Sequence, residues 1–475
     1  MDPGFGRTPL CWAAMNGHLE VVKMLLGMAD IDINLADMDG KSPLTWAAEN
    51  GDHEMANDLL AMEQIDPNVS DQGGRTPLCW AAQKGHYEIV AHLVGHDKTD
   101  PHYPDITGRT PLSWAAEMGN TKIVELLLAR EDVDLNFSDH QGQTPLIWAA
   151  DRGQEDIVKI LLGRHEVDPE KPDNDGWTPL SRAAAMGHLP VVRCLARDVN
   201  VNLGKANSYG QSPLYCAAEE GHLEIVRLLL ERDDVDSTCP DHEGQTPLAI
   251  ASWNGHEEVV KLLLNSNHIY PNMANINGAT ALLLAARGGH TRTVAALIQS
   301  AACPDRPDHT GRTPLAWAAG MGHEGVVKLL LGHGSVDPNS WDNAGQTALH
   351  WAVWQGEAAI VNIFLKSERV NVNSPCLNGR TPLVDAVMYK KPHIVEALLK
   401  RDDVDLNWMD VTMRTPLSWA AEWAGVDIVM LLLSRGARKY HSRDRYGALP
   451  VVYARRRGNH QLAGLLASDE DVDEI

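Results

Sequence analysis

The stretch "GRTPLSWAAEMGNTKIVELLLAREDVDLN" (residues 108–136) decides the fold, because near-copies of it recur along all 475 residues. The Thr of its "TPL" step, or the residue in its place, falls at Thr8, Ser42, Thr76, Thr110, Thr144, Thr178, Ser212, Thr246, Thr280, Thr313, Thr347, Thr381, Thr415 and Leu449. Every interval is 34 residues except the one ending at Thr313, which is 33. A fixed period of this length is typical of a repeat architecture. We therefore predict one continuous array of fourteen units over residues 1–467, followed by an acidic tail at 468–475.

One unit, residues 105–138, predicts two short helices joined by tight turns. Its "DITG" segment is typical of a turn, because Asp can bond the backbone ahead of it and Gly adopts positive φ. Thr110 is expected to cap a helix that has Pro111 at its first position and ends at Gly119. A second helix with an apolar stripe follows, and "REDVDLN" is expected to return in extended form. Such short helices are unstable alone, so each unit must pack against its neighbours as in a solenoid.

This unit resembles the ankyrin repeat in its T-P-L start, its A-A pair, its D-x-x-G finger and the Gly-His between helices, as in "GHLEIVRLLL" at 221–230. The resemblance covers essentially the whole chain. It implies an α fold: a curved, elongated ankyrin-repeat solenoid of about fourteen helix-turn-helix units with β-hairpin fingers. In style the chain is most similar to long fungal ankyrin arrays, some of which are C-terminal regions of NACHT-type signalling ATPases. A monomer is expected.

Several positions depart from the family pattern. Met413 occupies a turn Gly position, so that finger is expected to be distorted. Lys390 and Lys391 stand where Gly-His belongs, and the short interval has lost one loop residue. The family's usual His after "TPL" survives only as His350.

Composition excludes several classes of function. The chain carries 41 basic and 64 acidic residues, a net charge of −23, which argues against binding to duplex nucleic acid or to anionic membranes. Seven Cys, with no C-x-x-C pair, favour free thiols in a reducing compartment. The N-terminus lacks the regions of a signal peptide, and the apolar runs are too short to span a bilayer. We therefore expect a cytoplasmic protein, with the nucleus as the alternative, and neither nucleic acid nor membrane as partner.

The histidines do not predict a metal site. Seven of them share one position in the unit: His18, His86, His188, His222, His256, His290 and His323. Equivalent positions of stacked repeats lie about 8–10 Å apart, so these side chains cannot share one ion. No catalytic motif stands out, and the even spacing leaves no room for a catalytic insertion. We expect no enzymatic activity, no cofactor and no metal.

The aromatic residues are unusual, with fourteen Trp against three Phe. Eight Trp share the fifth place of "TPLxWAA": Trp12, Trp46, Trp80, Trp114, Trp148, Trp317, Trp351 and Trp419, with Tyr453 in the last unit. The resemblance puts an apolar Leu there, on the buried side of the first helix, so this row is interpreted as packing. Six Trp break the pattern and are candidates for binding: Trp177, Trp253, Trp341, Trp354, Trp408 and Trp423.

The family's variable positions, in the fingers, before "TPL" and after "AA", locate a candidate site on the concave side. The predicted partner-binding residues are Arg75, Arg109, Trp177, Tyr209, Trp253, Trp354, Tyr389 and Trp423. Two alternatives stay open. The basic residue before "TPL" is a common family form without a binding role, and packing between neighbours could bury some of the aromatics.

These patterns favour a non-enzymatic protein–protein interaction scaffold. Its concave groove would bind an intracellular protein with apolar and acidic patches, and aromatic residues and Arg would supply most of the affinity. The alternative is the sensor or autoinhibitory repeat segment of a larger NACHT-type signalling ATPase. The first unit begins within a finger with no polar capping repeat before it, which is expected either for an array cut from a longer parent or for a poorly protected end.

Overall fold

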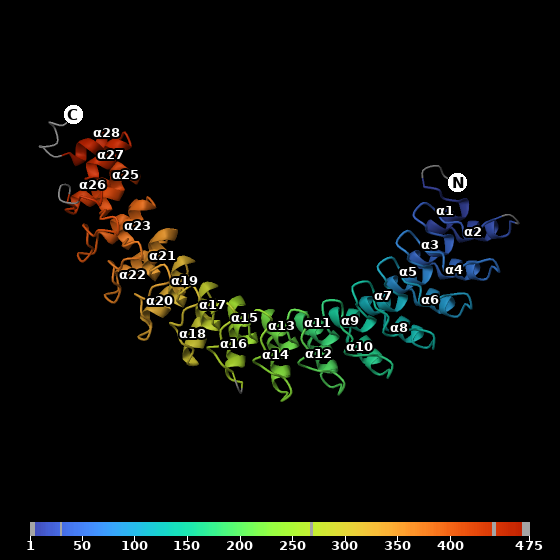
Figure 1. Cartoon of the computed structure of the whole chain (residues 1–475). Coiled ribbons are helices and arrows are strands. Elements are labelled where there is room, and N and C mark those ends of the chain that lie inside the picture. Colours follow the sequence, from blue (N-terminus) through green and yellow to red (C-terminus); the bar gives the residue numbers. More distant parts are fainter. Residues whose placement is uncertain (1–4, 29–30, 267–268, 439–442, 468–475) are drawn as a thin grey trace. The chain divides into compact units, whose positions relative to one another are not determined.

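The structure is a computed structural model that describes residues 5–28, 31–266, 269–438 and 443–467. Each repeat contributes a pair of short helices, numbered in chain order in Figure 1. The first helices are α1 (Pro9–Met15), α3 (Pro43–Asn50), α5 (Pro77–Lys84), α7 (Pro111–Met118), α9 (Pro145–Asp151), α11 (Pro179–Ala185), α13 (Pro213–Glu219), α15 (Pro247–Asn254), α17 (Ala281–Arg287), α19 (Pro314–Gly320), α21 (Ala348–Gln355), α23 (Pro382–Met388), α25 (Pro416–Trp423) and α27 (Pro450–Arg456). The second helices are α2 (Leu19–Leu26), α4 (His53–Leu60), α6 (Tyr87–Val94), α8 (Thr121–Leu127), α10 (Glu155–Leu162), α12 (Leu189–Leu195), α14 (Leu223–Leu230), α16 (Glu257–Leu264), α18 (Thr291–Gln299), α20 (Glu324–Gly332), α22 (Ala358–Leu365), α24 (Pro392–Leu398), α26 (Val426–Ser434) and α28 (His460–Leu466). The predicted helix-turn-helix solenoid is confirmed.

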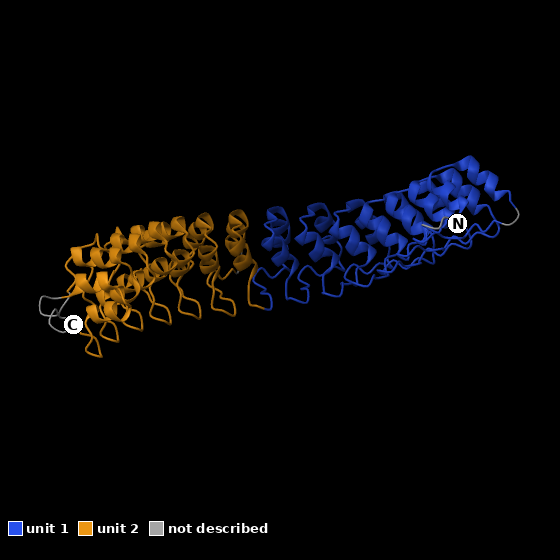
Figure 2. Cartoon of the chain, turned by 90° about the horizontal axis from the view of Figure 1, so that it is seen from above, with its two compact units in different colours: residues 1–242 blue, residues 243–475 orange. Residues whose placement is uncertain are grey.

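The helices divide into two compact units, residues 1–242 and residues 243–475 (Figure 2). Within each unit the first helices lie side by side in one row and the second helices in another (Figure 1). In the fourth repeat the core between the rows consists of Leu112 and Ala115 from α7 and Val124 and Leu127 from α8, all essentially inaccessible to solvent. The predicted tail at 468–475 lies outside the described residues.

The helix ends form as the repeat unit predicts. The Thr110 hydroxyl accepts a hydrogen bond of 3.3 Å from the Ser113 N–H, and Pro111 occupies the first position of α7. Gly119 ends the helix in the left-handed conformation, with φ of 81°. The "REDVDLN" segment, however, is not extended: it consists of turns, because the Asp134 carboxylate accepts the Asn136 N–H at 2.9 Å and closes the backbone locally.

The fingers are turns, and their β-hairpin character is not confirmed. Among the described residues only two isolated bridges occur, one joining Ala274 with Thr280 and one joining Trp341 with Thr347. A finger is closed mainly by its Asp. Asp105 Oδ1 accepts the backbone N–H groups of Thr107 and Arg109 at 2.8 and 3.0 Å. Side-chain bonding thus replaces a ladder of strand hydrogen bonds.

The finger that contains Met413 keeps the shape of the others, so the predicted distortion is wrong. Met413 adopts a φ of 62°, and its N–H still donates to the Asp410 carbonyl at 2.8 Å. Lys390, with φ of 54°, and Ala301, with φ of 62° in the shortened repeat, also accept the left-handed conformation. This conformation costs a side-chain-bearing residue about 1–2 kcal/mol, which the packing of adjacent repeats offsets.

Hydrogen bonds also join each repeat to the next. The Asn136 side chain donates to the Glu166 carbonyl at 2.6 Å and accepts the Asp168 N–H at 2.8 Å. Asn34, Asn68, Asn339 and Asn373 make the same pair of contacts in their own repeats. We call this series the asparagine ladder. It satisfies backbone groups in loops that contribute little apolar surface.

The recurrent Gly-His also joins repeats. His86 Nε2 lies 3.2 Å from the Glu49 carbonyl, at the end of the previous first helix. A side chain at Gly51 would collide with this ring, since its Cβ would lie 2.6 Å from the imidazole, and Gly51 has a φ of 80°. His188, His222, His290 and His323 bond equivalent carbonyls. These imidazole rings therefore link neighbouring repeats through hydrogen bonds to the backbone.

The tryptophan row bonds the fingers to the first helices. Trp114 Nε1 donates to Asp105 Oδ2 at 3.0 Å, and six equivalent pairs join Trp46 to Asp37, Trp80 to Asp71, Trp148 to Asp139, Trp317 to Asp308, Trp351 to Asp342 and Trp419 to Asp410. The expected burial is wrong for most of the row. Trp114 is 8% exposed, but Trp12 is 39% exposed and most of the others are half-buried. Leu and Ala fill the layer between helices, so each indole lies against its finger instead.

We expect Trp114→Ala to lower the free energy of unfolding by about 3–5 kcal/mol, because it removes a large side chain from a packed position. Trp114→Phe should lower it by about 1–3 kcal/mol, because the ring remains but the Asp105 carboxylate loses a donor. Urea denaturation followed by circular dichroism measures both. Equal stability of wild type and Trp114→Phe would show that the indole N–H contributes nothing.

Candidate functional site

The surface formed by the first helices and fingers of a unit, here called its inner face, carries basic side chains packed between Trp rings. Arg75 Cζ lies 4.7 Å from the centroid of the Trp80 ring and 4.9 Å from that of Trp114. Arg109 lies 3.5 and 3.9 Å from the rings of Trp114 and Trp148. Lys41 makes the same double contact one repeat before Arg75. Each contact contributes about 0.5–2 kcal/mol, so the basic residue before "TPL" stabilises the stacking of repeats.

Carboxylates pair with most of these cations in unit 1. Arg109 Nη2 lies 2.6 Å from Glu117 Oε2, and Arg152 binds the other oxygen of Glu117 at 2.9 Å. Lys41 is paired with Glu49 in the same way. Arg109 is only 7% exposed, so a partner would meet little more than the edge of its guanidinium. Arg75 faces the Gln83 amide oxygen instead, at 3.4 Å.

Arg75 and Arg109 border a hollow of about 410 Å³ on the inner face of unit 1. Its walls are the rings of Trp114 and Trp148 and the fingertips that carry Ile106, Thr107, His140 and Gln141. The sequence therefore predicted two residues of one surface depression. Their role in binding stays a prediction.

The other two candidates in unit 1 do not join this hollow. Trp177 is half-buried, with Arg182 Cζ 4.7 Å from its ring centroid. Arg182 takes the place of the row Trp in its repeat and binds Asp173 at 2.7 Å. Tyr209 is exposed at a fingertip.

Unit 2 brings the aromatic candidates closer together. The Trp354 ring lies 4.8 Å from that of Trp351 and 6.3 Å from that of Tyr389. Trp354 and Tyr389 are exposed, as is Trp253, which lies farther along the first-helix row. Trp423 is exposed as well, and the Arg457 guanidinium lies 4.1 Å from its ring. Large aromatic rings at such positions are frequent anchors of protein interfaces.

Two arginines connect these rings: Arg287, which sequence reasoning missed, and Arg312, which is one of the basic residues before "TPL". Arg287 Cζ lies 5.3 Å from the Trp253 ring centroid and 4.4 Å from that of Trp317. Arg312 lies 4.6 Å from Trp317 and 3.7 Å from Trp351. The result is a continuous aromatic–arginine band of Trp253, Arg287, Trp317, Arg312, Trp351, Trp354 and Tyr389. Arg287 occupies the first position after "AA", and comparing that position across all repeats could have found it.

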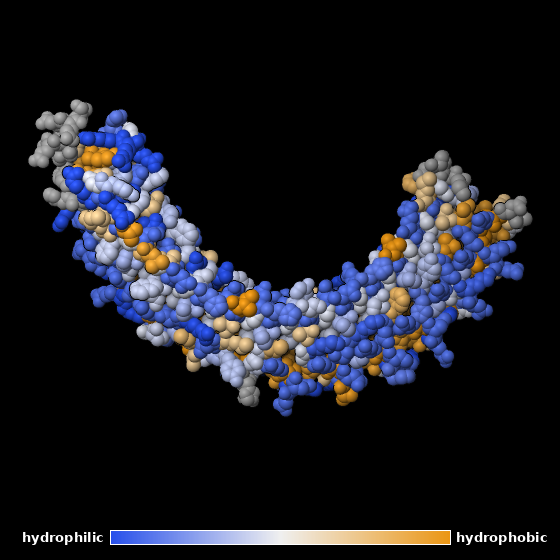
Figure 3. Space-filling model, in the orientation of Figure 1, coloured by the Kyte–Doolittle hydropathy of each residue, from blue (hydrophilic) through white to orange (hydrophobic). Residues whose placement is uncertain are grey.

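Strongly hydrophobic residues form small separate groups on the visible surface of each unit (Figure 3). Among the exposed apolar side chains at the fingertips of unit 2, Ile276, Leu377 and Val411 belong to different repeats. The inner face therefore offers aromatic and cationic contacts rather than one large aliphatic patch.

In one repeat of unit 2 the Asp lies on the first helix instead of in the finger. Its finger carries Cys376 where most other fingers have Asp, and Asp385 stands where the row has Trp. Asp385 is 1% exposed and lies 3.4 Å from Arg380 Nε. Burial raises the pKa of Asp385 to about 6, although Arg380 opposes this shift.

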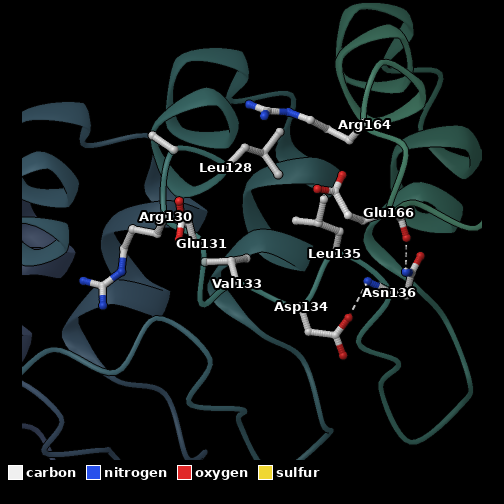
Figure 4. A pocket seen from close by; sticks show the side chains of 10 residues that line it. Leu128, Arg130, Glu131, Val133, Asp134, Leu135, Asn136, Arg164 and Glu166 are labelled. Carbon is white, nitrogen blue, oxygen red and sulfur yellow. Dashed lines mark hydrogen bonds between the residues drawn. The ribbon is translucent and has the colours of Figure 1, made fainter.

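A second hollow, of about 390 Å³, lies on the loop side of unit 1 (Figure 4). Its polar lining is largely paired within the protein. Arg130 makes two bonds to Asp132, at 2.8 and 2.7 Å, and Asn136 belongs to the asparagine ladder. This hollow is lined by scaffold contacts.

The described part of the chain contains no group of three His, Cys, Asp or Glu side chains that could hold a metal ion. None of the helices described is both long enough and apolar enough to cross a membrane.

Comparison with protein-family models gives matches along nearly the whole chain. The model described as "Ankyrin repeats (3 copies)" matches residues 1–71, 51–139, 128–205, 197–275, 267–342 and 333–410. The model described as "Ankyrin repeat" matches residues 413–445. No curated protein matches the chain.

The raised pKa of Asp385 predicts a pH-dependent loss of stability. The native state holds this proton up to about pH 6, whereas the unfolded chain releases it near its ordinary value of 3.8. Ionised Asp385 therefore destabilises the native state above that pKa. We expect Asp385→Asn to gain about 2 kcal/mol over wild type as pH rises from about 4 to 7. Urea denaturation across this range measures the difference, and a constant difference would contradict the assignment.

Proposed function

The chain belongs to the ankyrin-repeat family, and we propose that it is a non-enzymatic scaffold whose inner face binds an intracellular protein partner. Ankyrin repeats are generally protein–protein interaction modules, and arrays of them are typically non-enzymatic. We further propose that the chain acts as a monomer in the cytoplasm, with the nucleus as the alternative compartment.

The observation that carries this proposal is the aromatic–arginine band of unit 2. Trp253, Trp354 and Tyr389 keep exposed ring surface on the inner face. Their neighbours hold them in place, since Trp354 packs on Trp351 and Arg287 packs on Trp253. A rigid aromatic side chain loses little conformational entropy on binding, so a preorganised band favours affinity.

The alternative function, as the sensor or autoinhibitory segment of a NACHT-type ATPase, would use the same inner face and stays a prediction. The open reading frame around the coding sequence tests it. ATPase motifs encoded in frame upstream would support it. An in-frame stop codon immediately before the codon of Met1 would contradict it.

We expect Trp253→Ala and Trp354→Ala each to weaken partner capture by at least about tenfold, because anchor residues of interfaces contribute about 2 kcal/mol or more. Capture from lysate of the source organism, quantified by mass spectrometry, identifies the partner and compares the variants. Tyr270→Ala is the matched control, since it removes an exposed ring from a loop of the same unit.

Circular dichroism and melting curves of the three variants should match wild type. Partner capture that survives both Trp substitutions would exclude the band as the binding surface. A large loss of helicity in either variant would show that its ring belongs to the core.

A further inference from the structure

Resting on the proposed function, we propose that the inner face of unit 2 recognises an extended acidic segment of its protein partner. Two carboxylates of that segment, on residues two apart, would pair with Arg287 and Arg312. Apolar side chains of the same segment would pack on the exposed rings of Trp253 and Trp354.

The two guanidinium groups have cation–π contacts but few anionic ones. Among the described residues no carboxylate forms an ion pair with Arg287, whose side chain is exposed. The carboxylate nearest to Arg312 is Asp342 Oδ2, 3.8 Å from Nε, and that oxygen already accepts the Trp351 indole N–H at 3.0 Å. The Arg312 side chain is 26% exposed, so part of it remains accessible to a ligand.

Other repeats show what is missing here. In three repeats the residue eight positions after the cation supplies its carboxylate, as Glu117 does for Arg109 at 2.6 Å and Glu422 for Arg414 at 2.7 Å. In others this residue is uncharged, as Gln83 is after Arg75. In the repeat of Arg312 this position is Gly320. Neither φ nor space demands glycine there, because an added Cβ would meet only the Trp351 side chain, at an ordinary 3.6 Å. The counter-ion is thus absent where the scaffold could hold one.

The fingertips and first-helix ends around Arg287 and Arg312 carry no acidic side chain, although Glu243 is exposed at the fingertip of the repeat that contains Trp253. From repeat nine to repeat thirteen the fingertip pairs are Ile276 and Asn277, His309 and Thr310, Asn343 and Ala344, Leu377 and Asn378, and Val411 and Thr412. From repeat nine to repeat twelve the two positions after the first-helix "AA" or its equivalent are Arg287 and Gly288, Gly320 and Met321, Trp354 and Gln355, and Met388 and Tyr389. In a chain of net charge −23, this absence makes the face complementary to an anionic partner.

Geometry favours two carboxylates on an extended chain. Arg287 and Arg312 lie 4.4 and 4.6 Å from the centroid of the same Trp317 ring, so their guanidinium carbons are at most about 9 Å apart. Side chains two residues apart on an extended strand lie about 6.6–6.8 Å apart on one face. A stacked guanidinium keeps its N–H edge for bidentate pairing with a carboxylate.

The test selects short random peptides by display on the full chain at physiological salt, then measures each selected peptide by fluorescence anisotropy. We expect the selected peptides to carry two Asp or Glu residues, two positions apart, beside aromatic or aliphatic residues. Arg287→Glu should weaken their binding by at least about tenfold, and Arg312→Gln should weaken it as well. Arg292→Glu, the same charge reversal at an exposed position of α18, should leave it unchanged.

Selected peptides without carboxylates, or peptides that bind Arg287→Glu as tightly as wild type, would overturn the inference. If those peptides still lose affinity for Trp354→Ala, the proposed binding face stands and only its acidic specificity fails. If no peptide is selected, or if the peptides ignore both substitutions, both proposals fail. A labelled single-stranded oligonucleotide that binds more tightly than every peptide, and depends on Arg287, would assign the face to nucleic acid instead.

Discussion

In most of the described repeats, a hydrogen bond joins the first helix to the carboxylate of its own finger. A five-residue turn and a two-turn helix are each unstable alone, and this bond joins them across nine residues of sequence. One Asp serves both segments, because Oδ1 of Asp105 closes the finger while Oδ2 accepts the Trp114 indole. Arg182 and Tyr453 make the equivalent bond in two repeats without the Trp, whereas the repeats with Cys216, Ile250, Leu284 or Asp385 at this position form their helices without such a donor. The indole donor explains why the chain uses Trp where Phe could supply only volume.

The bonds between indoles and finger carboxylates also determine which side chains of the inner face remain exposed. Indoles held against the fingers lie far enough apart for a cation to pack between neighbours, and Glu117 neutralises such a cation in unit 1. Unit 2 keeps the rings and the cations but lacks the neutralising residue next to Arg312. The absence of one carboxylate thus leaves Arg312 without the counter-ion that Arg109 has, without any change in the fold.

The sequence predicted those features that depend on residues close together in the chain. The period, the Thr110 cap, the helix start at Pro111 and the left-handed Gly119 all follow from local chemistry. The hairpin character of the fingers came from family resemblance alone, and it is not confirmed. The position of the Trp rings and the stacking on Arg287 depend on contacts between a helix, its finger and the next repeat. The repeat period identifies equivalent positions in different repeats, but it does not show whether their side chains point to the core, to the finger or to solvent.

The asparagine ladder has a consequence for the history of the gene. Asn136 bonds only backbone groups of the following repeat, and Asn34, Asn68, Asn339 and Asn373 do the same. Hydrogen bonds to main-chain groups do not depend on which side chains the neighbouring repeat carries. Unequal crossing-over can therefore delete or duplicate a whole 34-residue period and rejoin matching surfaces. The length of such an array can change in a single genetic event, while the exceptional repeat of Cys376 and Asp385 would remain as a marker of position.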